Sequence, residues 1–426
     1  MKILVVYYIN NFRKIRSTIL EHLYSIKEIP DAQCFFWNSF FVPPKYLYAV
    51  HFDVIIYHYT YFALKWRPHF FEEISKKIER FKNVDSFKIA ILQDEYLNTS
   101  IVNDFLKEQN IQSIFSLANS KDCLELYPID KSNVKYRNQV LSPGYISKTA
   151  LKYTEDRLIK HSERPVDIAY RARKNPFWLG EASVMKWKLS EVFENELKKH
   201  SLIHDISTKG NDAFMGNDWY DFLLSSRAAL GCEGGASIHD KDGIIRNKVR
   251  EYIDEYPNAA FEEVKKSCFP DDDWSIHYLT ISPRNFDCAI TKTCQVLIEG
   301  EYSGILKPNI HYIPLKKDYS NIDSVINKLY DIEYCERIAE TTYNDIVASG
   351  KYMYSVFSMQ ISDHINNNFK VSRNQSKIKN SLFKLIVHVN EIVTRIGVQS
   401  FYQAKRIKSF LTKQKYIANK LFDKRF

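Results

Sequence analysis

The passage with the clearest capacity for chemistry lies near the middle of the second half, at 281–287. It reads Ile-Ser-Pro-Arg-Asn-Phe-Asp and leads from an apolar run into a short helical stretch. Ser282 can cap that helix and Pro283 suits its first turn, so the free amides there would attract a phosphate. Arg284 would add a charge-assisted contact to the same anion, and Asp287 could bind ribose hydroxyls. The pattern alone fits equally well a capped structural helix with an exposed arginine.

A second passage places a thiol and a carboxyl group beside glycines. The apolar run 228–231 ends in glycine, and Cys232, Glu233, Gly234 and Gly235 follow it directly. A strand that ends in this way presents side chains at the edge of a sheet, where glycines let a ligand approach the backbone. The spacing therefore indicates functional groups at a sheet edge.

The elements that must position these groups follow a βαβα pattern. Short β-branched or aromatic runs alternate with longer amphipathic stretches in both halves, which is typical of parallel sheets covered by helices. The first half predicts strands at 3–7, 54–57, 89–93 and 114–117 and helices near 13–26, 70–81 and 102–108. The second half predicts strands at 166–170, 202–206, 228–231, 278–281, 295–298 and 312–315 and helices at 184–200, 218–225, 285–290, 322–329 and 332–348.

These elements predict an α/β fold of two Rossmann-like domains that face a cleft. The expected divisions are an N-terminal Rossmann-like domain over 1–145, a linker over 146–163, a second Rossmann-like domain over 164–370 and a helical tail over 371–426. Ligands bind at the carboxyl ends of the strands in such folds. The sequence contains neither GxGxxG nor GxxxxGK[ST], so the usual dinucleotide and ATP phosphate loops are absent.

Charge is distributed unevenly along the chain. The formal net charge is +9, but 371–426 contains 13 Lys and Arg against Glu391 and Asp423, which leaves the preceding 370 residues at −2. A neutral body argues against a general nucleic-acid binder. The apolar residues of the tail recur at helical spacing, so it predicts basic amphipathic helices that either rest on an anionic membrane or pack toward a partner or downstream domain.

The cysteines and the first residues bear on location. The seven cysteines are scattered singly, without a CxxC pair, so they predict neither a disulfide framework nor a structural zinc site. The chain starts with an apolar run too short for a signal peptide, and no run of 18 apolar residues occurs. We therefore expect a cytoplasmic protein, with possible peripheral contact at the inner face of the membrane.

Residues 164–350 resemble the donor domain of GT-B glycosyltransferases. The resemblance rests on the strand–helix–strand pattern around Asp287, on the acidic loop that follows it, and on the segment from His311 to Leu315 that closes the domain. It implies that Asp287, one methylene shorter than the usual glutamate, lies near the ribose. It also implies that the loop lies near the donor sugar.

Residues 1–400 further resemble the retaining β-Kdo glycosyltransferase domain of the WbbB O-antigen synthase type. The resemblance is carried by the passage from Ala229 to Ile238 and the acids Asp240 and Asp242. It implies transfer of Kdo from CMP-β-Kdo to a lipopolysaccharide O-antigen saccharide, through a covalent adduct on an aspartate. Cys232 stands at the position of that aspartate, and a thioether link to the sugar would be a poor leaving group. The resemblance thus implies a disabled or trapping variant, unless Cys232 is a small buried residue behind an active Glu233.

The expected site follows from these interpretations. The catalytic pair is Cys232 with Glu233, and the acceptor would meet His58, Asp94 and Glu95 at strand ends of the first domain. The donor-binding residues are predicted to be Arg171, Arg173, Gly234, Gly235, Ser237, Ser282, Arg284, Asn285, Asp287, Glu301, Tyr302, Ser303, Gly304 and His311. The acidic run 271–273 reads as a solvated turn. The resemblance implies a metal-independent transferase, so neither a metal nor a cofactor is expected.

Two rival functions remain open at this point. One is a GT-B transferase that uses a nucleoside diphosphate sugar, which would present two phosphates where a CMP-sugar presents one. The other is a non-enzymatic scaffold that binds membrane or nucleic acid through the basic tail.

Overall fold

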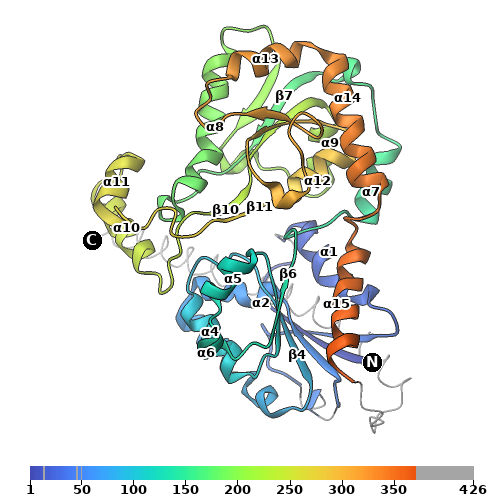
Figure 1. Cartoon of the computed structure of the whole chain (residues 1–426), viewed down its shortest axis with the longest axis vertical. Coiled ribbons are helices and arrows are strands. Elements are labelled where there is room, and N and C mark those ends of the chain that lie inside the picture. The colour runs from blue at the N-terminus through green and yellow to red at the C-terminus, as the bar shows by residue number, and fades with distance from the viewer. Residues whose placement is uncertain (13–14, 45–46, 49, 371–426) are drawn as a thin grey trace, which may run out of the picture.

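The computed structural model describes residues 1–12, 15–44, 47–48 and 50–370, and it consists of two lobes, each built on a parallel β-sheet flanked by helices (Figure 1). The predicted fold class, two Rossmann-like α/β domains, is confirmed by these two sheets. The basic tail predicted over 371–426 lies outside the described residues. Among the helices of the described part, none is long and apolar enough to cross a membrane.

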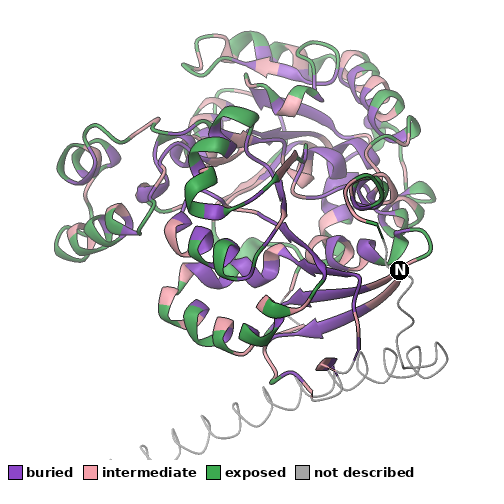
Figure 2. Ribbon diagram, turned by 60° about the horizontal axis from the view of Figure 1, so that its bottom comes forward, coloured by how far each residue is buried: buried purple, intermediate pink, exposed green. Residues whose placement is uncertain are grey.

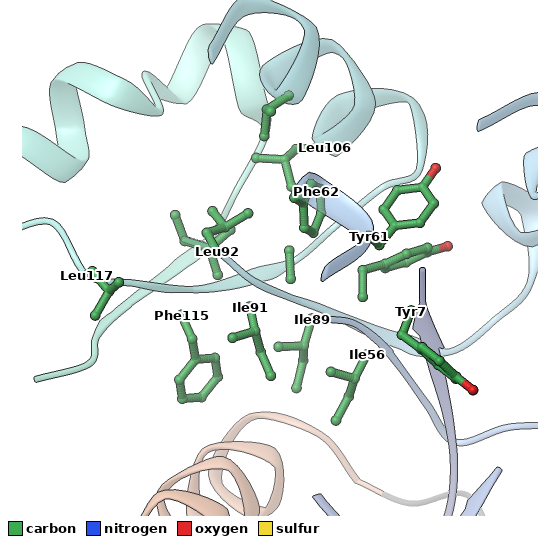
Figure 3. Packing of buried hydrophobic residues seen from close by; sticks show 14 of the residues in the cluster. Tyr7, Ile56, Tyr61, Phe62, Ile89, Ile91, Leu92, Leu106, Phe115 and Leu117 are labelled. Carbon is green, nitrogen blue, oxygen red and sulfur yellow. The ribbon is translucent and has the colours of Figure 1, made fainter. Parts of the chain in front are cut away.

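The first sheet has six parallel strands in the order β2-β1-β3-β4-β5-β6. They are β1 (Lys2–Tyr7), β2 (Gln33–Asn38), β3 (Val54–Tyr57), β4 (Phe87–Ile91), β5 (Ser113–Ser116) and β6 (Tyr136–Gln139). The four central strands are almost entirely buried because helices cover both of their faces. Figure 3 shows this packing, with Ile56, Ile89 and Ile91 lined up along one face of the sheet.

Helices of the first lobe bury one apolar face against this sheet and turn their polar face outward (Figure 2). In α4, for example, Val102, Phe105 and Leu106 are buried, which is the spacing of a single helical stripe. The helices are α1 (Ser17–Ser25), α2 (Tyr59–Phe62), α3 (Pro68–Lys76), α4 (Thr99–Glu108), α5 (Ser120–Leu126) and α6 (Ile129–Ser132).

The second sheet has five parallel strands in the order β13-β12-β9-β7-β8. They are β7 (Val166–Arg171), β8 (His204–Ser207), β9 (Ser226–Gly231), β12 (Cys294–Ile298) and β13 (Ile313–Leu315). The helices of this lobe are α8 (Glu181–Leu197), α9 (Asn217–Leu224), α12 (Pro283–Ile290), α13 (Ile322–Tyr330) and α14 (Ile332–Thr342). The strand order reverses between β7 and β9, which makes that point the topological switch of the sheet.

A segment inserted between β9 and α12 corrects one sequence prediction. The strand expected over 278–281 as part of the parallel sheet is instead β11 (Tyr278–Thr280), which pairs antiparallel with β10 (Gly234–Ala236) in a separate hairpin. Gly235 makes this pairing possible, because a Cβ there would lie 1.8 Å from the carbonyl oxygen of Tyr278. A short apolar run does not reveal which sheet it joins, so periodicity could not detect the difference.

The inserted segment and the last described helix both pack on the first lobe. Between β10 and β11 the chain forms α10 (Ile244–Glu255) and α11 (Phe261–Cys268), which project to one side in Figure 1. Buried residues of this segment share one core cluster with the first sheet. The helix α15 (Tyr354–Asn368) also lies against that sheet, where Ser113 and His364 are joined by a hydrogen bond of 2.8 Å. Two later parts of the chain therefore pack on the first lobe, the segment inserted between β9 and β12 of the second sheet and the helix that follows β13.

The chain crosses from the first lobe to the second, and later returns, at neighbouring positions. It leaves the first lobe through Ile146 and returns beside it at Tyr354, and the Ile146 amide donates to the Tyr352 carbonyl oxygen over 2.8 Å. The helix α7 (Lys148–Glu155) then leads toward the second sheet. The sequence divisions at 145 and 163 fall in this passage.

Candidate active site

A cavity of about 340 Å³ lies at the carboxyl edge of the second sheet. It opens at the ends of β7 and β9, the two strands between which the order of the sheet reverses. Connections leave this point in opposite directions, so they leave a crevice in which such folds bind their ligands. Its lining comprises Arg16, Ser17, Thr18, Tyr170, Arg171, Ala172, Arg173, Asn175, Lys186, Lys209, Ala213, Phe214, Met215, Gly216, Trp219, Tyr220, Cys232, Ser282, Pro283, Arg284 and Asp287.

Cations dominate the charge of this lining. Arg16 comes from the first lobe, whereas Arg173, Lys186 and Arg284 come from the second. Among the described residues, no salt bridge neutralises any of these four side chains. Burial lowers the pKa of Arg16, and the nearby charges of Arg173 and Arg284 lower it further. Asp287 is the one carboxylate beside these four cations in the described lining, so their mutual repulsion favours an anion between them.

Arg171 differs from these cations because the protein already neutralises it. Its guanidinium donates to both carboxylate oxygens of Asp205, over 2.7 and 2.8 Å. The same group lies over the ring of Phe222, at 4.5 Å from the centroid. Arg171 therefore shapes the wall of the cavity, and its carbonyl oxygen accepts a hydrogen bond from Arg284.

Asp287 is the one acid in the described lining of the cavity. It lies in the first turns of α12 and accepts hydrogen bonds from Trp219 Nε1 at 2.9 Å and from the Tyr220 hydroxyl at 3.3 Å. Burial raises the pKa of Asp287 to about 6, partly offset by the Trp219 hydrogen bond. Trp219 and Tyr220 thus hold the carboxylate in place, and its predicted contact with ribose stays a prediction.

Cys232 lies at the end of β9 and lines the cavity, as the sequence suggested for a group at a sheet edge. Its side chain is buried, with 9% of the residue exposed. Burial raises the pKa of the thiol, although Lys186 and Arg284 act in the opposite direction. Because the thiolate is the nucleophilic form of cysteine, the environment of Cys232 keeps it in the less reactive state at neutral pH.

Glu233 follows Cys232 but does not line the cavity. Its Oε1 accepts the amide hydrogen of Tyr302 over 2.7 Å, and a Cβ at Gly300 would lie 2.3 Å from its other oxygen. Burial raises the pKa of Glu233, and the amides of Tyr302 and Glu301 counteract this shift. Glu233 therefore fixes the loop that follows β12.

That loop holds four of the predicted donor residues away from the cavity. Tyr302 is fully buried and donates its hydroxyl to the Ile298 carbonyl oxygen over 2.6 Å. Ser303 adopts φ of 54° and accepts the Ile281 amide over 3.3 Å. Glu301 and Gly304 flank these two residues, and neither contributes to the lining. The loop supports β11 from behind, and its predicted contact with the donor stays a prediction.

The remaining residues that the sequence predicted to bind the donor bond with other parts of the protein and do not line the cavity. Asn285 accepts the Ser282 amide over 3.0 Å, so it supports the first turn of α12 from within the protein. Ser237 donates to Asp273 over 2.6 Å, next to the paired glycines Gly234 and Gly235 of β10. His311 hydrogen bonds with Asp345 over 3.0 Å and is buried. The structure brings to the cavity Arg171, Arg173, Cys232, Ser282, Arg284 and Asp287, and not these other residues.

The residues predicted to meet the acceptor lie in the first lobe with partners of their own. His58 is fully buried, and its Nε2 hydrogen bonds with His22 Nδ1 over 3.0 Å. Glu95 is also fully buried and accepts hydrogen bonds from Ser116, Leu117 and Tyr278. Asp94 is half-buried and accepts the Tyr96 hydroxyl over 3.2 Å. None of the three lines the cavity, and of these residues only Asp94 has exposed surface to offer a ligand.

The sequence did not predict that the first lobe and the loop 209–216 contribute residues to the lining of the cavity. Arg16, Ser17 and Thr18 belong to the start of α1, and nothing local marks them as facing the other lobe. The loop 209–216 carried a signal, because two glycines and exposed apolar residues follow a strand end. Among the described residues, no group of three or more His, Cys, Asp or Glu side chains could hold a metal ion.

Comparisons with known proteins found similar solved structures but no matching family. No family model matches the sequence, and no curated protein matches it. Among solved structures, HepE of Anabaena in complex with UDP-glucose is 10% identical, with a TM-score of 0.46, over 86% of this chain and 100% of that one. Sucrose-phosphate synthase of Thermosynechococcus elongatus is 8% identical, with a TM-score of 0.44, over 86% and 98%. An α1,3-fucosyltransferase is 9% identical, with a TM-score of 0.42, over 89% and 93%. The function of this chain has to be argued from its own residues.

Proposed function

We propose that this chain is a glycosyltransferase that binds an anionic nucleotide sugar at the switch point of its second sheet. The observation that carries the proposal is the convergence of unpaired cations, Arg16, Arg173 and Arg284, on one cavity between the lobes. A phosphate among them would turn their mutual repulsion into attraction. The rings of Tyr170 and Trp219 beside them suit the less polar parts of such a ligand.

The same groups account for catalysis of glycosyl transfer. When the bond between sugar and phosphate breaks, negative charge develops on the leaving phosphate oxygen. Cations already fixed around that position stabilise the charge without reorganising, which is the largest single contribution in many enzymes. Arg284 is fixed in this way, because its guanidinium donates to the Arg171 carbonyl oxygen and lies 5.1 Å from the Tyr170 ring centroid. Arg16 belongs to the first lobe, so the full set of cations requires both lobes.

The donor that we propose is CMP-β-Kdo, with a lipopolysaccharide O-antigen saccharide as acceptor. This donor carries a phosphate and a sugar carboxylate, so it offers two anionic groups to the cations of the cavity. Cys232 stands at the end of β9 beside these cations, where the anomeric carbon would lie. The sequence resemblance points to the same donor, so the charge of the cavity and the sequence pattern support one interpretation.

The proposed transfer retains configuration through an adduct at position 232. The sulfur electron pair of Cys232 forms a bond to the anomeric carbon, CMP leaves with the electrons of the broken bond, and the thiol proton passes to solvent. An acceptor hydroxyl then attacks the same carbon, loses its proton, and returns the electron pair to sulfur. Because burial raises the pKa of the thiol and a thioether leaves poorly, the adduct should form slowly and persist.

An intact-mass spectrum after incubation with CMP-β-Kdo tests this proposal. We expect a gain of one Kdo on the protein, lost in a Cys232→Ser variant that still binds CMP. Binding of CMP without any mass gain would contradict the adduct. Failure of the full chain to bind any nucleotide would contradict the glycosyltransferase function itself.

A nucleoside diphosphate sugar is the second candidate donor. The lining includes six cations in the described residues, Arg16, Arg171, Arg173, Lys186, Lys209 and Arg284, and that number also suits two phosphates. Calorimetric titration separates the candidates. Tighter binding of CMP than of UDP supports the first donor, and tighter binding of UDP supports the second.

A further inference from the structure

The loop between β8 and α9 forms one wall of the cavity and differs from the others. Its residues 209–216 are all exposed, and Lys209, Ala213, Phe214, Met215 and Gly216 line the cavity. Phe214 is 36% exposed and Met215 is 42% exposed. Large apolar side chains that face water at the rim of a cation-lined cavity indicate a surface that a ligand covers.

The ring of Phe214 is held in position from within the protein. It packs against Phe222 with ring centroids 4.8 Å apart, and the Arg171 guanidinium lies 5.0 Å from its centroid. Arg171 is in turn fixed by Asp205 over 2.7 Å. The ring is therefore oriented before a ligand arrives, while part of its surface remains open.

The stem of the loop is anchored, and the space around its two glycines is open. Asp212 accepts the Ser207 hydroxyl over 2.6 Å, and its carbonyl oxygen accepts Arg171 Nε over 3.0 Å. At Gly210 and Gly216, by contrast, a Cβ would meet no heavy atom within 4 Å. Gly216 adopts φ of 60°, a left-handed conformation that allows the sharp turn into α9. The space beside Met215 and Gly216 is consequently open to a ligand.

Because β9, β7 and β8 are neighbours, three kinds of side chain lie in a row along the carboxyl edge of the second sheet. Cys232 follows β9, the cations Arg171 and Arg173 follow β7, and the apolar loop follows β8. Neighbouring strands lie about 4.8 Å apart, so the row spans roughly 10 Å. A nucleotide sugar has the same order along its length, with the sugar at one end, phosphate in the middle and the base at the other end.

We infer that the loop 209–216 is the nucleobase subsite of this cavity, with the base stacked against Phe214 and Met215. This inference rests on the proposed function and adds to it the orientation of the donor, with its sugar toward Cys232. The anchored aromatic ring supplies the stacking surface, and the flexible thioether of Met215 closes over the other face of the base.

Calorimetric titration of matched ligands tests the inference. CMP, UMP and AMP are compared with ribose 5-phosphate, which keeps the sugar and phosphate but lacks the base. In a Phe214→Ala/Met215→Ala variant, the nucleotide with the highest affinity should bind about tenfold or more weakly, as expected for loss of base stacking. Ribose 5-phosphate should bind with unchanged affinity. Phe214→Tyr should retain nucleotide affinity, and Met359→Ala, at a residue 53% exposed on α15, is the control.

Two outcomes overturn the inference while leaving the proposed function in place. One is an unchanged affinity of the double variant for nucleotides. The other is an equal loss for nucleotide and ribose 5-phosphate, which would mean that the loop organises the phosphate site and does not bind the base. If the wild-type chain binds neither kind of ligand, the proposed function fails and this inference fails with it.

Discussion

The carboxyl edges of the two sheets both carry polar side chains, but those side chains differ in whether the protein satisfies them. At the first sheet, His58 bonds with His22, and Glu95 accepts three hydrogen bonds. Lys65 is buried there and donates to the Gln93 carbonyl oxygen over 2.9 Å. At the second sheet, Arg173 and Lys186 face a cavity without a described salt bridge. Two similar architectures thus differ at the same edge: at the first sheet the polar side chains bond with one another, whereas at the second sheet cations face a cavity.

Glu95 shows how hydrogen-bonded side chains at the edge of the first sheet join distant parts of the chain. Its partner Tyr278 belongs to β11, which follows the second sheet's third strand in the chain and packs on the first lobe. A buried carboxylate in this position joins two parts of the chain that are far apart in sequence. Unpaired cations at the other edge cost stability, and that cost is characteristic of a site that awaits its ligand.

The largest effect is expected from Cys232→Asp, because it changes the chemistry at the ligand-binding edge. A carboxylate is ionised at neutral pH and is a better leaving group than a thiolate joined to a sugar. Since loss of a covalent nucleophile typically costs many powers of ten, turnover of CMP-β-Kdo should rise by orders of magnitude. Steady-state assays of the two forms measure this. Equal turnover would show that position 232 is not the nucleophile.

Glu95→Ala tests how much the hydrogen bonds at the edge of the first sheet stabilise the fold. The change leaves the hydroxyls of Ser116 and Tyr278 and the Leu117 amide without their buried acceptor, at a cost of about 3 kcal/mol in the free energy of unfolding. Urea denaturation measures the loss, with Glu79→Ala as the control because the side chain of Glu79 is 67% exposed. A loss below about 1 kcal/mol would contradict the bridging role of Glu95.

Asp287 gives a prediction about pH that distinguishes the two edges further. Its pKa is about 6 in the folded protein against 3.8 ordinarily, so the unfolded chain releases this proton first as pH rises. The contribution of Asp287 to the stability of the fold should therefore fall between about pH 4 and pH 6 by up to about 3 kcal/mol and then stay level. Unfolding measured from pH 4 to pH 8 should show that Asp287→Asn removes this part of the decline. The same decline in both forms would refute the assignment.

Arg284→Ala should have the smallest effect of the four. It removes one charge-assisted contact to the phosphate, which corresponds to about 1.5–3 kcal/mol of CMP binding. Calorimetry measures the affinity, and Arg337→Ala, at an exposed position of α14 outside the cavity, is the matched control. Unchanged CMP affinity would exclude Arg284 from the site.

Prediction from sequence succeeded where local pattern carries the information. The alternation of apolar runs with helical stripes predicted most strands of both sheets, and the Ser-Pro start of α12 was placed correctly at 282–283. It did not predict β2, β6, β10 or the helices α2, α5, α6, α10, α11 and α15. The strand β6 contains Tyr, Arg, Asn and Gln, a polar composition that does not read as a strand.

Some positions in the candidate site were likewise predictable from local sequence, whereas side-chain orientation was not. Cys232 and Arg284 lie at an element boundary beside apolar runs, so their place at a sheet edge follows from the chain itself. Glu233 has the same local setting, yet its carboxylate turns to the Tyr302 amide and away from the cavity. Which way a side chain turns at a strand end depends on neighbours that are distant in sequence.

The sequence by itself determined that two parallel α/β units exist and that their strand ends carry the polar groups, because burial and periodicity are properties of short segments. Only the tertiary structure decided that β11 pairs with β10, that Arg16 of the first lobe meets Arg173 and Arg284 of the second, and that the loop 209–216 overhangs them. The physical reason is that strand order and lobe contact are set by long-range packing. A ligand site assembled from several strand ends becomes visible only when that packing is complete.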